Sequence, residues 1–285
     1  MSGTPIGLAW RQVRDRFRAS GLETPELDAR LLAQAAFGID AMALVRRERD
    51  LVGDEPARTL EQFAQRRLVG EPVSRIVGRR EFWGLDFALN DSTLDPRPET
   101  EMLVAEAMAF LETKPAPHFI DLGTGTGAIA ISILTALKKA RGVATDLAEE
   151  ALAGARQNAE RHGVAARLEF RQGAWWQAVP HTALFDLIVS NPPYIATDEI
   201  SKLSAEVRVF DPKLALDGGW DGLEAYRAIA SQAARRLNPG GLAVLEIGYN
   251  QGEIISKIFG RVGFGRVEVI KDLAGLDRVV LASHS

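Results

Sequence analysis

The sequence predicts an α/β fold with a parallel sheet, preceded by a small all-helical domain and a β-hairpin linker. From residue 98 onward, short apolar runs suited to strands alternate with helical segments, as in a parallel sheet with crossover helices. Before residue 79, apolar residues recur at helical spacing. Between these parts, aromatic and aliphatic residues flank Gly84, which favours a short hairpin. We therefore expect a helical domain at 1–78, a hairpin linker at 79–97 and an α/β domain at 98–285.

Four helices are expected in the N-terminal domain. In the first, Trp10, Val13 and Phe17 share one face, and Ser20-Gly21 ends the helix. The second has Thr24 as its N-cap and Pro25 at its first position. Asp40 and Asp54 are expected caps of the third and the fourth. The four helices span residues 8–19, 25–37, 41–48 and 55–69.

The expected elements of the C-terminal part alternate as a parallel sheet requires. Helices are expected at residues 99–112, 127–138, 148–162, 221–237 and 250–260. Strands are expected at 118–122, 142–146, 167–171, 185–190 and 241–248, with two closing strands at 266–270 and 277–282.

Charge and composition exclude several classes of function. There are 34 basic and 38 acidic residues, a net charge of −4, and neither half of the chain is a basic platform for nucleic acid. Cysteine is absent, which excludes disulfides, thiolate metal sites and cysteine nucleophiles and fits a reducing compartment. The most apolar helical stretch, residues 128–137, is too short to cross a bilayer. We expect a cytoplasmic protein without membrane, metal or direct nucleic-acid partner.

A glycine-rich turn follows the strand expected at 118–122. The sequence Asp121-Leu-Gly-Thr-Gly-Thr-Gly127 leads from strand to helix, so its backbone N–H groups can approach a ligand closely. With Ala128 it also matches the dinucleotide pattern, which leaves NAD as an alternative to an adenosyl ligand. The next strand ends at Asp146, which can accept hydrogen bonds from both ribose hydroxyls or cap the following helix.

The strand expected at 185–190 ends in Asn191-Pro192-Pro193-Tyr194. Two prolines make this a stiff turn, which alone could be a simple strand cap. Asn191 offers a hydrogen-bond acceptor and a donor, and Tyr194 offers a flat aromatic face. These groups suit a planar NH₂ group, as in adenine, cytosine or a carboxamide. Beside the glycine turn and Asp146, the motif indicates methylation of an amino group.

The sequence resembles the S-adenosylmethionine-dependent methyltransferases, and within them the HemK/PrmC family of protein-(glutamine-N5) methyltransferases of peptide-chain release factors. The resemblance covers nearly the whole chain. Its carriers are the glycine turn and the Asn-Pro-Pro-Tyr motif, together with Gly78-Arg-Arg-Glu-Phe-Trp-Gly84, Pro96-Arg-Pro-Glu-Thr-Glu101, Ala215-Leu-Asp-Gly-Gly-Trp-Asp-Gly222 and Glu246-Ile-Gly248.

The resemblance implies a Rossmann-like class I S-adenosylmethionine-dependent methyltransferase sheet and a monomer whose helical domain helps to dock the release factor. The reaction would move a methyl group from S-adenosyl-L-methionine to the glutamine side-chain nitrogen of the Gly-Gly-Gln motif in class I release factors, leave S-adenosyl-L-homocysteine, and modulate translation termination. Expected cofactor contacts are Asp121, Gly123, Thr124, Gly125, Thr126, Gly127, Asp146, Trp175 and Asn191. Expected substrate contacts are Asn191, Pro192, Pro193 and Tyr194, of which Asn191, Pro192 and Tyr194 would be catalytic.

Three positions depart from the family pattern. Asp95 replaces an aliphatic residue, which puts the packing of that segment in doubt. Ala174 stands where an acid commonly precedes the adenine-side tryptophan, and the tandem Trp175-Trp176 leaves that tryptophan ambiguous by one position.

Four alternative functions remain. A DNA adenine-N6 or cytosine-N4 methyltransferase uses the same turn, but the chain lacks the basic stripe that such an enzyme needs. A paralogue that methylates a glutamine of a large-subunit ribosomal protein typically differs in the Pro-Arg-Pro-Glu-Thr-Glu segment. The other two are an NAD-dependent oxidoreductase and a non-catalytic binding module.

Overall fold

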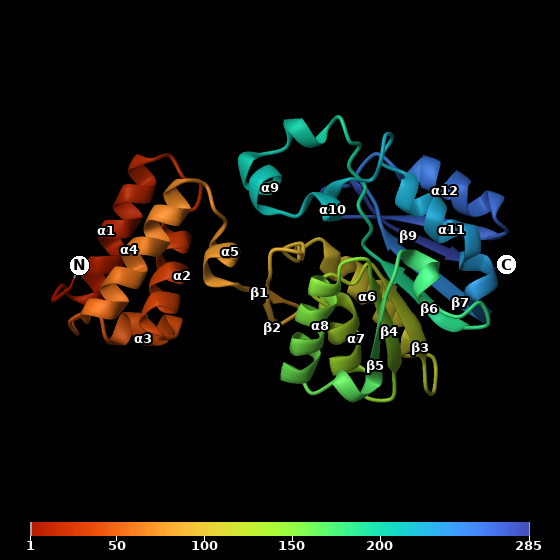
Figure 1. Cartoon of the computed structure of the whole chain (residues 1–285), viewed down its shortest axis with the longest axis horizontal. Helices are drawn as coiled ribbons and strands as arrows, with labels where there is room; N and C mark the ends of the chain where they lie inside the picture. The colour runs from red at the N-terminus through yellow and green to blue at the C-terminus, as the bar shows by residue number, and fades with distance from the viewer. Residues whose placement is uncertain (1, 285) are drawn as a thin grey trace. The chain divides into compact units, whose positions relative to one another are not determined.

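The structure is a computed structural model that describes residues 2–284 (Figure 1). The chain folds into two compact units. The first runs up to Arg79 and includes the later segment Ala205–Phe210. The second consists of Arg80–Ser204 and the described residues from Asp211 onward.

The first unit is built from helices. The four predicted helices are present, and the structure adds two short ones that local sequence did not indicate. Trp10, Val13 and Phe17 are buried in its core, as the helical spacing predicted. The helices are α1 (Ile6–Ala19), α2 (Pro25–Phe37), α3 (Ala41–Arg46), α4 (Asp54–Leu68), α5 (Val73–Val77) and α9 (Ala205–Phe210).

The predicted helix caps are only partly correct. Asp54 is the first residue of α4 and not its cap. Asp40 accepts a hydrogen bond from the backbone N–H of Ala43 at 2.6 Å and so caps α3. The Thr24 side chain makes no capping bond, because its hydroxyl donates to Asp28 Oδ1 at 2.8 Å instead. Asp28 is buried, so its need for hydrogen-bond donors outweighs that of the helix end.

A buried ion pair joins helices of this unit. The Arg67 Nε donates to Asp28 Oδ2 at 2.7 Å, and its Nη1 donates to Glu206 Oε1 at 2.6 Å. Arg67 and Asp28 are both nearly inaccessible to solvent. This network connects α2 and α4 to α9, a helix that lies far away in the sequence.

The second unit opens with the predicted hairpin. Its strands, β1 (Arg79–Phe82) and β2 (Leu85–Ala88), form a two-stranded sheet. Phe82 and Phe87 are buried in the core of the unit, and Asn158 bonds both backbone polar groups of Ala88. The hairpin is therefore anchored by apolar packing and by a buried amide.

A seven-stranded sheet forms the centre of the second unit, in the order β5-β4-β3-β6-β7-β9-β8. The first five strands in this order are parallel, and β9 is antiparallel to both of its neighbours. The strands are β3 (His118–Leu122), β4 (Arg141–Asp146), β5 (Leu168–Gln172), β6 (Phe185–Ser190), β7 (Leu237–Glu246), β8 (Arg266–Lys271) and β9 (Asp277–Ser283). The accompanying helices are α6 (Thr100–Leu111), α7 (Ala128–Ala136), α8 (Glu149–Arg161), α10 (Lys213–Leu216), α11 (Glu224–Arg236) and α12 (Gly252–Arg261).

One strand begins earlier than predicted. The expected strand at 241–248 begins at Leu237, because Leu237 already pairs with Phe185 before an irregularity in the register. The local sequence around Pro239 contains two glycines and is typical of a turn. The strand begins earlier only because its first residue pairs with the neighbouring strand β6.

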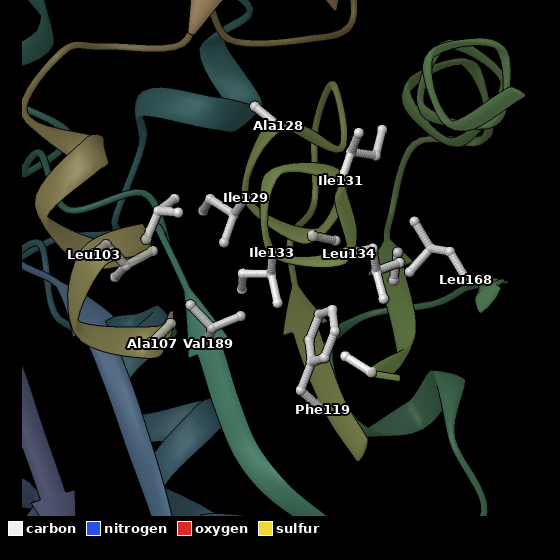
Figure 2. Close-up of a cluster of buried hydrophobic side chains, with 14 of the residues drawn as sticks. Leu103, Ala107, Phe119, Ala128, Ile129, Ile131, Ile133, Leu134, Leu168 and Val189 are labelled. Atoms are coloured by element: carbon white, nitrogen blue, oxygen red, sulfur yellow. The ribbon is translucent and has the colours of Figure 1, made fainter. Parts of the chain in front are cut away.

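The helices pack closely on the sheet. Figure 2 shows Ile129 and Ile133 of α7 among Leu103, Phe119 and Val189, which come from α6, β3 and β6. The fit leaves little room, since a Cβ on Gly142 of β4 would lie 2.6 Å from the Phe119 ring. Such packing makes the carboxyl ends of the strands a rigid platform.

The order of the parallel strands reverses at β3, which lies between β4 and β6. Ligands of open α/β sheets bind at this switch point, beyond the carboxyl ends of the strands. The glycine turn follows β3 there, Asn191 follows β6, and Asp146 is the last residue of β4.

Candidate active site

A cleft of about 380 Å³ opens at the carboxyl ends of β3, β4 and β6. That volume is in the range of small-molecule and cofactor sites. Its walls come from seven segments of the sequence. The lining residues are Ser92, Leu94, Gly123, Gly125, Asp146, Leu147, Gly173, Ala174, Trp175, Asn191, Pro193, Leu214, Ala215, Asp217, Gly218, Glu224, Ala225 and Ala228.

The cleft brings together some of the predicted site residues and not others. Gly123, Gly125, Asp146, Trp175, Asn191 and Pro193 line it. The other predicted residues are not part of its lining: Asp121, Thr124, Thr126, Gly127, Pro192 and Tyr194. Most of this second group is buried, so these residues shape the walls from behind.

The glycine turn needs its glycines for two different reasons. Gly123, Gly125 and Gly127 have φ of +74°, +55° and +80°, a region in which side chains are strained. A Cβ on Gly127 would also lie 2.8 Å from Ile131 Cδ1. Apart from its two chain neighbours, none of the described residues comes within 4 Å of a Cβ built on Gly125, so that residue leaves the floor of the cleft open.

The backbone N–H groups of this turn are mostly used within the protein. Those of Gly123 and Thr124 both donate to the Thr145 carbonyl, at 2.9 and 2.8 Å. The Gly125 N–H donates to Asp146 Oδ2 at 2.9 Å. A pyrophosphate bound at a helix N-terminus depends on free N–H groups, and here they have other partners. This bonding pattern disfavours a dinucleotide.

Two carboxylates flank the turn. Burial raises the pKa of Asp121 to about 7, the negative charge of Asp146 adds to this rise, and the hydrogen bond from Thr124 opposes it. Burial likewise raises the pKa of Asp146, although N–H groups of Ala148 and Gly125 donate to it. Each Asp146 oxygen accepts one of these bonds and retains capacity for another. The site therefore favours cationic ligands and hydroxyl donors.

The tandem tryptophans lie in different environments. Trp175 lines the cleft with a φ of +50°, and its ring would contact a Cβ on Gly123 at 3.6 Å. Trp176 is 3% exposed, and its indole N–H donates to the Ile229 carbonyl at 2.8 Å. Trp175 is therefore the aromatic wall of the cleft, and Trp176 belongs to the core.

The other two departures from the family pattern also have a place in the structure. Asp95 is buried and forms an ion pair with Arg80 at 3.6 Å, so an acid is accommodated where the family has an aliphatic residue. Ala174 lines the cleft beside Trp175 and presents only a methyl group there.

The Asn-Pro-Pro-Tyr turn is supported by a segment that follows it in the sequence. The Ile195 N–H donates to the Leu216 carbonyl, and its own carbonyl accepts from the Gly218 N–H. A Cβ on Gly222 would lie 2.5 Å from the Tyr194 carbonyl, which explains the glycine at that position. Gln251 adds a bond from its Nε2 to the same carbonyl at 3.0 Å, a contact that no local sequence signal indicated.

The side-chain amide of Asn191 is held at one end only. Its Nδ2 donates to Thr100 Oγ1 at 3.1 Å, and Thr100 Oγ1 donates to Glu246 Oε2 at 2.6 Å. Its Oδ1 accepts no hydrogen bond from residues 2–284. Thr100 and Glu246 belong to family motifs, but the sequence alone assigned no role to either residue.

Tyr194 is not a base at neutral pH. Burial raises the pKa of its hydroxyl to about 12, and the nearby charge of Glu246 contributes to the rise. Among the described residues, no group of three or more histidine, aspartate or glutamate side chains could hold a metal ion. The available chemistry is therefore hydrogen bonding, shape and negative charge.

The switch-point cleft, the glycine turn and the acidic end of β4 define a class I methyltransferase. Two solved structures share the fold. The hMettl16 catalytic domain in complex with a MAT2A 3′UTR hairpin is 16% identical, covers 75% of this chain and 81% of its own, and has a TM-score of 0.59. A methyltransferase from Pyrococcus furiosus is 20% identical, covers 79% of this chain and 100% of its own, and has a TM-score of 0.51.

Sequence comparison is more specific. The PrmC N-terminal domain profile matches residues 9–78, and the methyltransferase small domain profile matches residues 99–219. The release factor glutamine methyltransferase of Bradyrhizobium diazoefficiens is 46% identical, over 99% of this chain and 95% of its own. That of Cereibacter sphaeroides is also 46% identical, over 96% of each chain. The chain belongs to the release factor glutamine methyltransferase family.

Among the helices in the described part of the chain, none combines the length and apolar character needed to cross a lipid bilayer.

Proposed function

We propose that the chain transfers the methyl group of S-adenosyl-L-methionine to the side-chain nitrogen of the glutamine in the Gly-Gly-Gln motif of class I release factors. The observation that carries the proposal is the Asn191 amide. Its nitrogen is bound by Thr100, while its oxygen remains available to accept a hydrogen bond at the cleft. An acceptor of this kind suits the NH₂ group of a carboxamide.

The cleft fits S-adenosyl-L-methionine, which supplies an electrophilic methyl group on a sulfonium and leaves as S-adenosyl-L-homocysteine. Asp146 has remaining acceptor capacity for ribose hydroxyls. The Trp175 ring offers a flat face to an adenine. Gly123 and Gly125 present no side chain that would block the methionine part, and the Asp146 carboxylate at the cleft favours a cation. Thr124, Thr126 and Gly127 would maintain the turn.

The protein's contribution to the reaction is orientation. A carboxamide nitrogen is a poor nucleophile because its lone pair is delocalised, and positive charge develops on it during transfer. In this proposal Asn191 Oδ1 and the Pro192 carbonyl accept the two N–H bonds of the glutamine and stabilise that charge. Tyr194 limits the tilt of the amide plane, and Pro193 stiffens the turn. Correct placement of reactants can remove about 7 to 11 kcal/mol from a bimolecular barrier.

The domain organisation completes the proposal. The helical domain at 1–78 would help to dock the release factor, the hairpin segment at 79–97 would link it to the catalytic domain, and 98–285 would carry the reaction. Limited proteolysis that releases a stable fragment starting near residue 79, with the hairpin still packed on the sheet, would support a boundary after the helical domain, whereas cleavage only inside the sheet would contradict it.

Substrate identity can be tested with a panel. The purified protein is incubated with isotope-labelled S-adenosyl-L-methionine and a class I release factor, a large-subunit ribosomal protein or duplex DNA. We expect one methyl group on the Gly-Gly-Gln glutamine, located by tandem mass spectrometry. Label on the ribosomal protein or DNA alone would refute the release-factor proposal.

The Asn191→Ala variant tests the proposed site. We expect it to fold and to bind S-adenosyl-L-methionine but to lose most turnover, because the glutamine NH₂ loses an acceptor. Normal methylation of the release factor by this variant would exclude Asn191 from the reaction.

A further inference from the structure

Three side chains form a directed chain of hydrogen bonds behind the cleft. Asn191 follows β6, Thr100 is the first residue of α6, and Glu246 is the last residue of β7. The distances are 3.1 Å from Asn191 Nδ2 to Thr100 Oγ1 and 2.6 Å from Thr100 Oγ1 to Glu246 Oε2. Thr100 and Glu246 are 4% and 2% exposed, so water does not compete for these bonds.

The chemistry of the three groups sets the direction of this chain. An asparagine amide has nearly the same shape in either orientation, and a hydroxyl can both donate and accept. An asparagine and a threonine alone would therefore permit two arrangements. An ionised carboxylate only accepts, so the Thr100 hydrogen must point to Glu246. The Thr100 oxygen is then left to accept, and it receives the NH₂ group of Asn191.

We propose that Thr100 and Glu246 are positioning residues that hold the Asn191 amide with its oxygen toward the cleft, an inference that rests on the proposed methylation of a glutamine. With the amide reversed, Asn191 would present an NH₂ group to the NH₂ group of the substrate. Two donors would then face each other, and the glutamine nitrogen would lose the acceptor that aligns it.

The surroundings of Glu246 make this device sensitive to pH. Burial raises the pKa of Glu246 to about 7. The hydrogen bond from Thr100, the positive charge of Arg278 and a weaker hydrogen bond from the Asn191 NH₂ group oppose the rise. The negative charge of Glu99 adds to it.

Two phenols also face Glu246. Tyr226 on α11 donates to its backbone carbonyl at 2.9 Å, and Tyr194 lies in the proline turn. Both hydroxyls have a raised pKa, chiefly through burial, and stay neutral near pH 7. Of Glu246 and these two phenols, only Glu246 therefore changes its charge near pH 7. As the pH falls through 7, the Glu246 carboxylate is protonated and can donate a hydrogen bond to Thr100. The Thr100 hydroxyl can then donate to Asn191 instead, and both orientations of the Asn191 amide become permitted.

Thr100→Val and Thr100→Ser separate this role from a structural one. Thr100→Val removes the hydroxyl at nearly constant volume, and we expect kcat on the release factor to fall at least about tenfold, since small errors of placement are costly. Its affinity for S-adenosyl-L-methionine, measured by calorimetry, should stay within about twofold because Asn191 alone is released. Thr100→Ser restores the hydroxyl and should recover most of the turnover.

The matched control is Thr135→Val. It makes the same chemical change in the same unit, on a hydroxyl that has no hydrogen-bond partner among the described residues. We expect wild-type kcat from this variant. Wild-type kcat from Thr100→Val, or an equal loss in Thr100→Ser, would overturn the positioning role.

The pH profile is a second readout. At saturating S-adenosyl-L-methionine and release factor, wild-type kcat should rise as the pH increases through about 7 and then level off. The reason is that ionised Glu246 sets the direction of the hydrogen bonds from Asn191 and Thr100. Glu246→Gln carries both a donor and an acceptor at every pH, so it should have a lower plateau without this rise. An identical rise in Glu246→Gln would exclude Glu246 as its source.

A measurement on the wild-type protein does not depend on any variant's folding or on the substrate. In protein labelled with ¹⁵N-asparagine, the side-chain NH₂ signal of Asn191 should shift with an inflection near pH 7 as Thr100 changes from acceptor to donor. A signal that is constant from pH 5.5 to 8.5 would contradict the proposal. Failure of the panel experiment, with this inflection present, would instead refute only the substrate.

Discussion

Replacing Asp121 with asparagine should change how the stability of the second unit depends on pH. Asp121 is fully buried, and its pKa is raised from 3.8 to about 7, chiefly by that burial. Asparagine has nearly the same size, can still accept the bond from the Thr124 hydroxyl, and does not titrate. A comparison of the two proteins therefore reports the ionisation of Asp121 together with its coupling to Asp146.

The sign and the size follow from proton binding. Between pH 4 and 7 the native state keeps the Asp121 proton while the unfolded chain releases it, so the wild type loses stability as the pH rises. One pH unit in this window corresponds to about 1.4 kcal/mol. From pH 5 to 8 the free energy of unfolding of Asp121→Asn should therefore gain about 2.7 kcal/mol relative to the wild type, with nearly all of the change below pH 7.

Urea denaturation of the ligand-free proteins measures this difference. Four of the five tryptophans lie in the second unit, so fluorescence reports mainly on its unfolding. Titrating groups other than Asp146, whose charge interacts with Asp121, are common to both proteins and cancel in the comparison. A difference in unfolding free energy that stays constant from pH 5 to 8 would show that Asp121 is already ionised in the native state, and would refute the reasoning.

Three further predictions concern the cleft and the helical unit. Asp146→Ala should lower the affinity for S-adenosyl-L-methionine at least about tenfold, since hydrogen bonds to charged groups contribute about 1.5 to 3 kcal/mol each; unchanged affinity in calorimetry would exclude it as the ribose ligand. Trp175→Ala should weaken the binding of S-adenosyl-L-methionine with little loss of stability, whereas Trp176→Ala should destabilise the fold by about 3 to 5 kcal/mol. Equal denaturation midpoints of the two variants would contradict the assignment of Trp175 to the cleft and Trp176 to the core. Arg67→Met leaves Asp28 buried without its main partner and should destabilise the first unit by about 3 to 5 kcal/mol in thermal unfolding, a loss that a second change, Asp28→Asn, should largely reverse.

Strong local patterns predicted most of the regular structure. The strands of the sheet were visible as apolar runs, and Trp10, Val13 and Phe17 identified the buried face of α1. The short helices α5, α9 and α10 were missed because they depend on distant contacts. Glu206 of α9, for example, is tied to Arg67, and its own six-residue segment has no periodicity that could indicate a helix.

The candidate site likewise contains residues that the sequence could identify and residues that it could not. Asn191, Asp146 and the glycines could be found because each is the end of a strand-and-turn pattern. Thr100 and Glu246 meet across 146 positions of sequence, and their contact depends on α6 lying beside the end of β7. The choice between the two tryptophans likewise depended on the positive φ of Trp175, which spacing along the chain cannot reveal.

The two outermost strands of the seven-stranded sheet also bear on how copies of the molecule can associate. A free sheet edge is a template for pairing with another chain, and charged side chains along it discourage that pairing. The edge strand β8 carries Arg266, Glu268 and Lys271, and the opposite edge strand β5 carries Glu169 and Arg171. Both ends of the sheet thus resist extension by strand addition, and any self-association of this unit would have to use its helical faces or its loops.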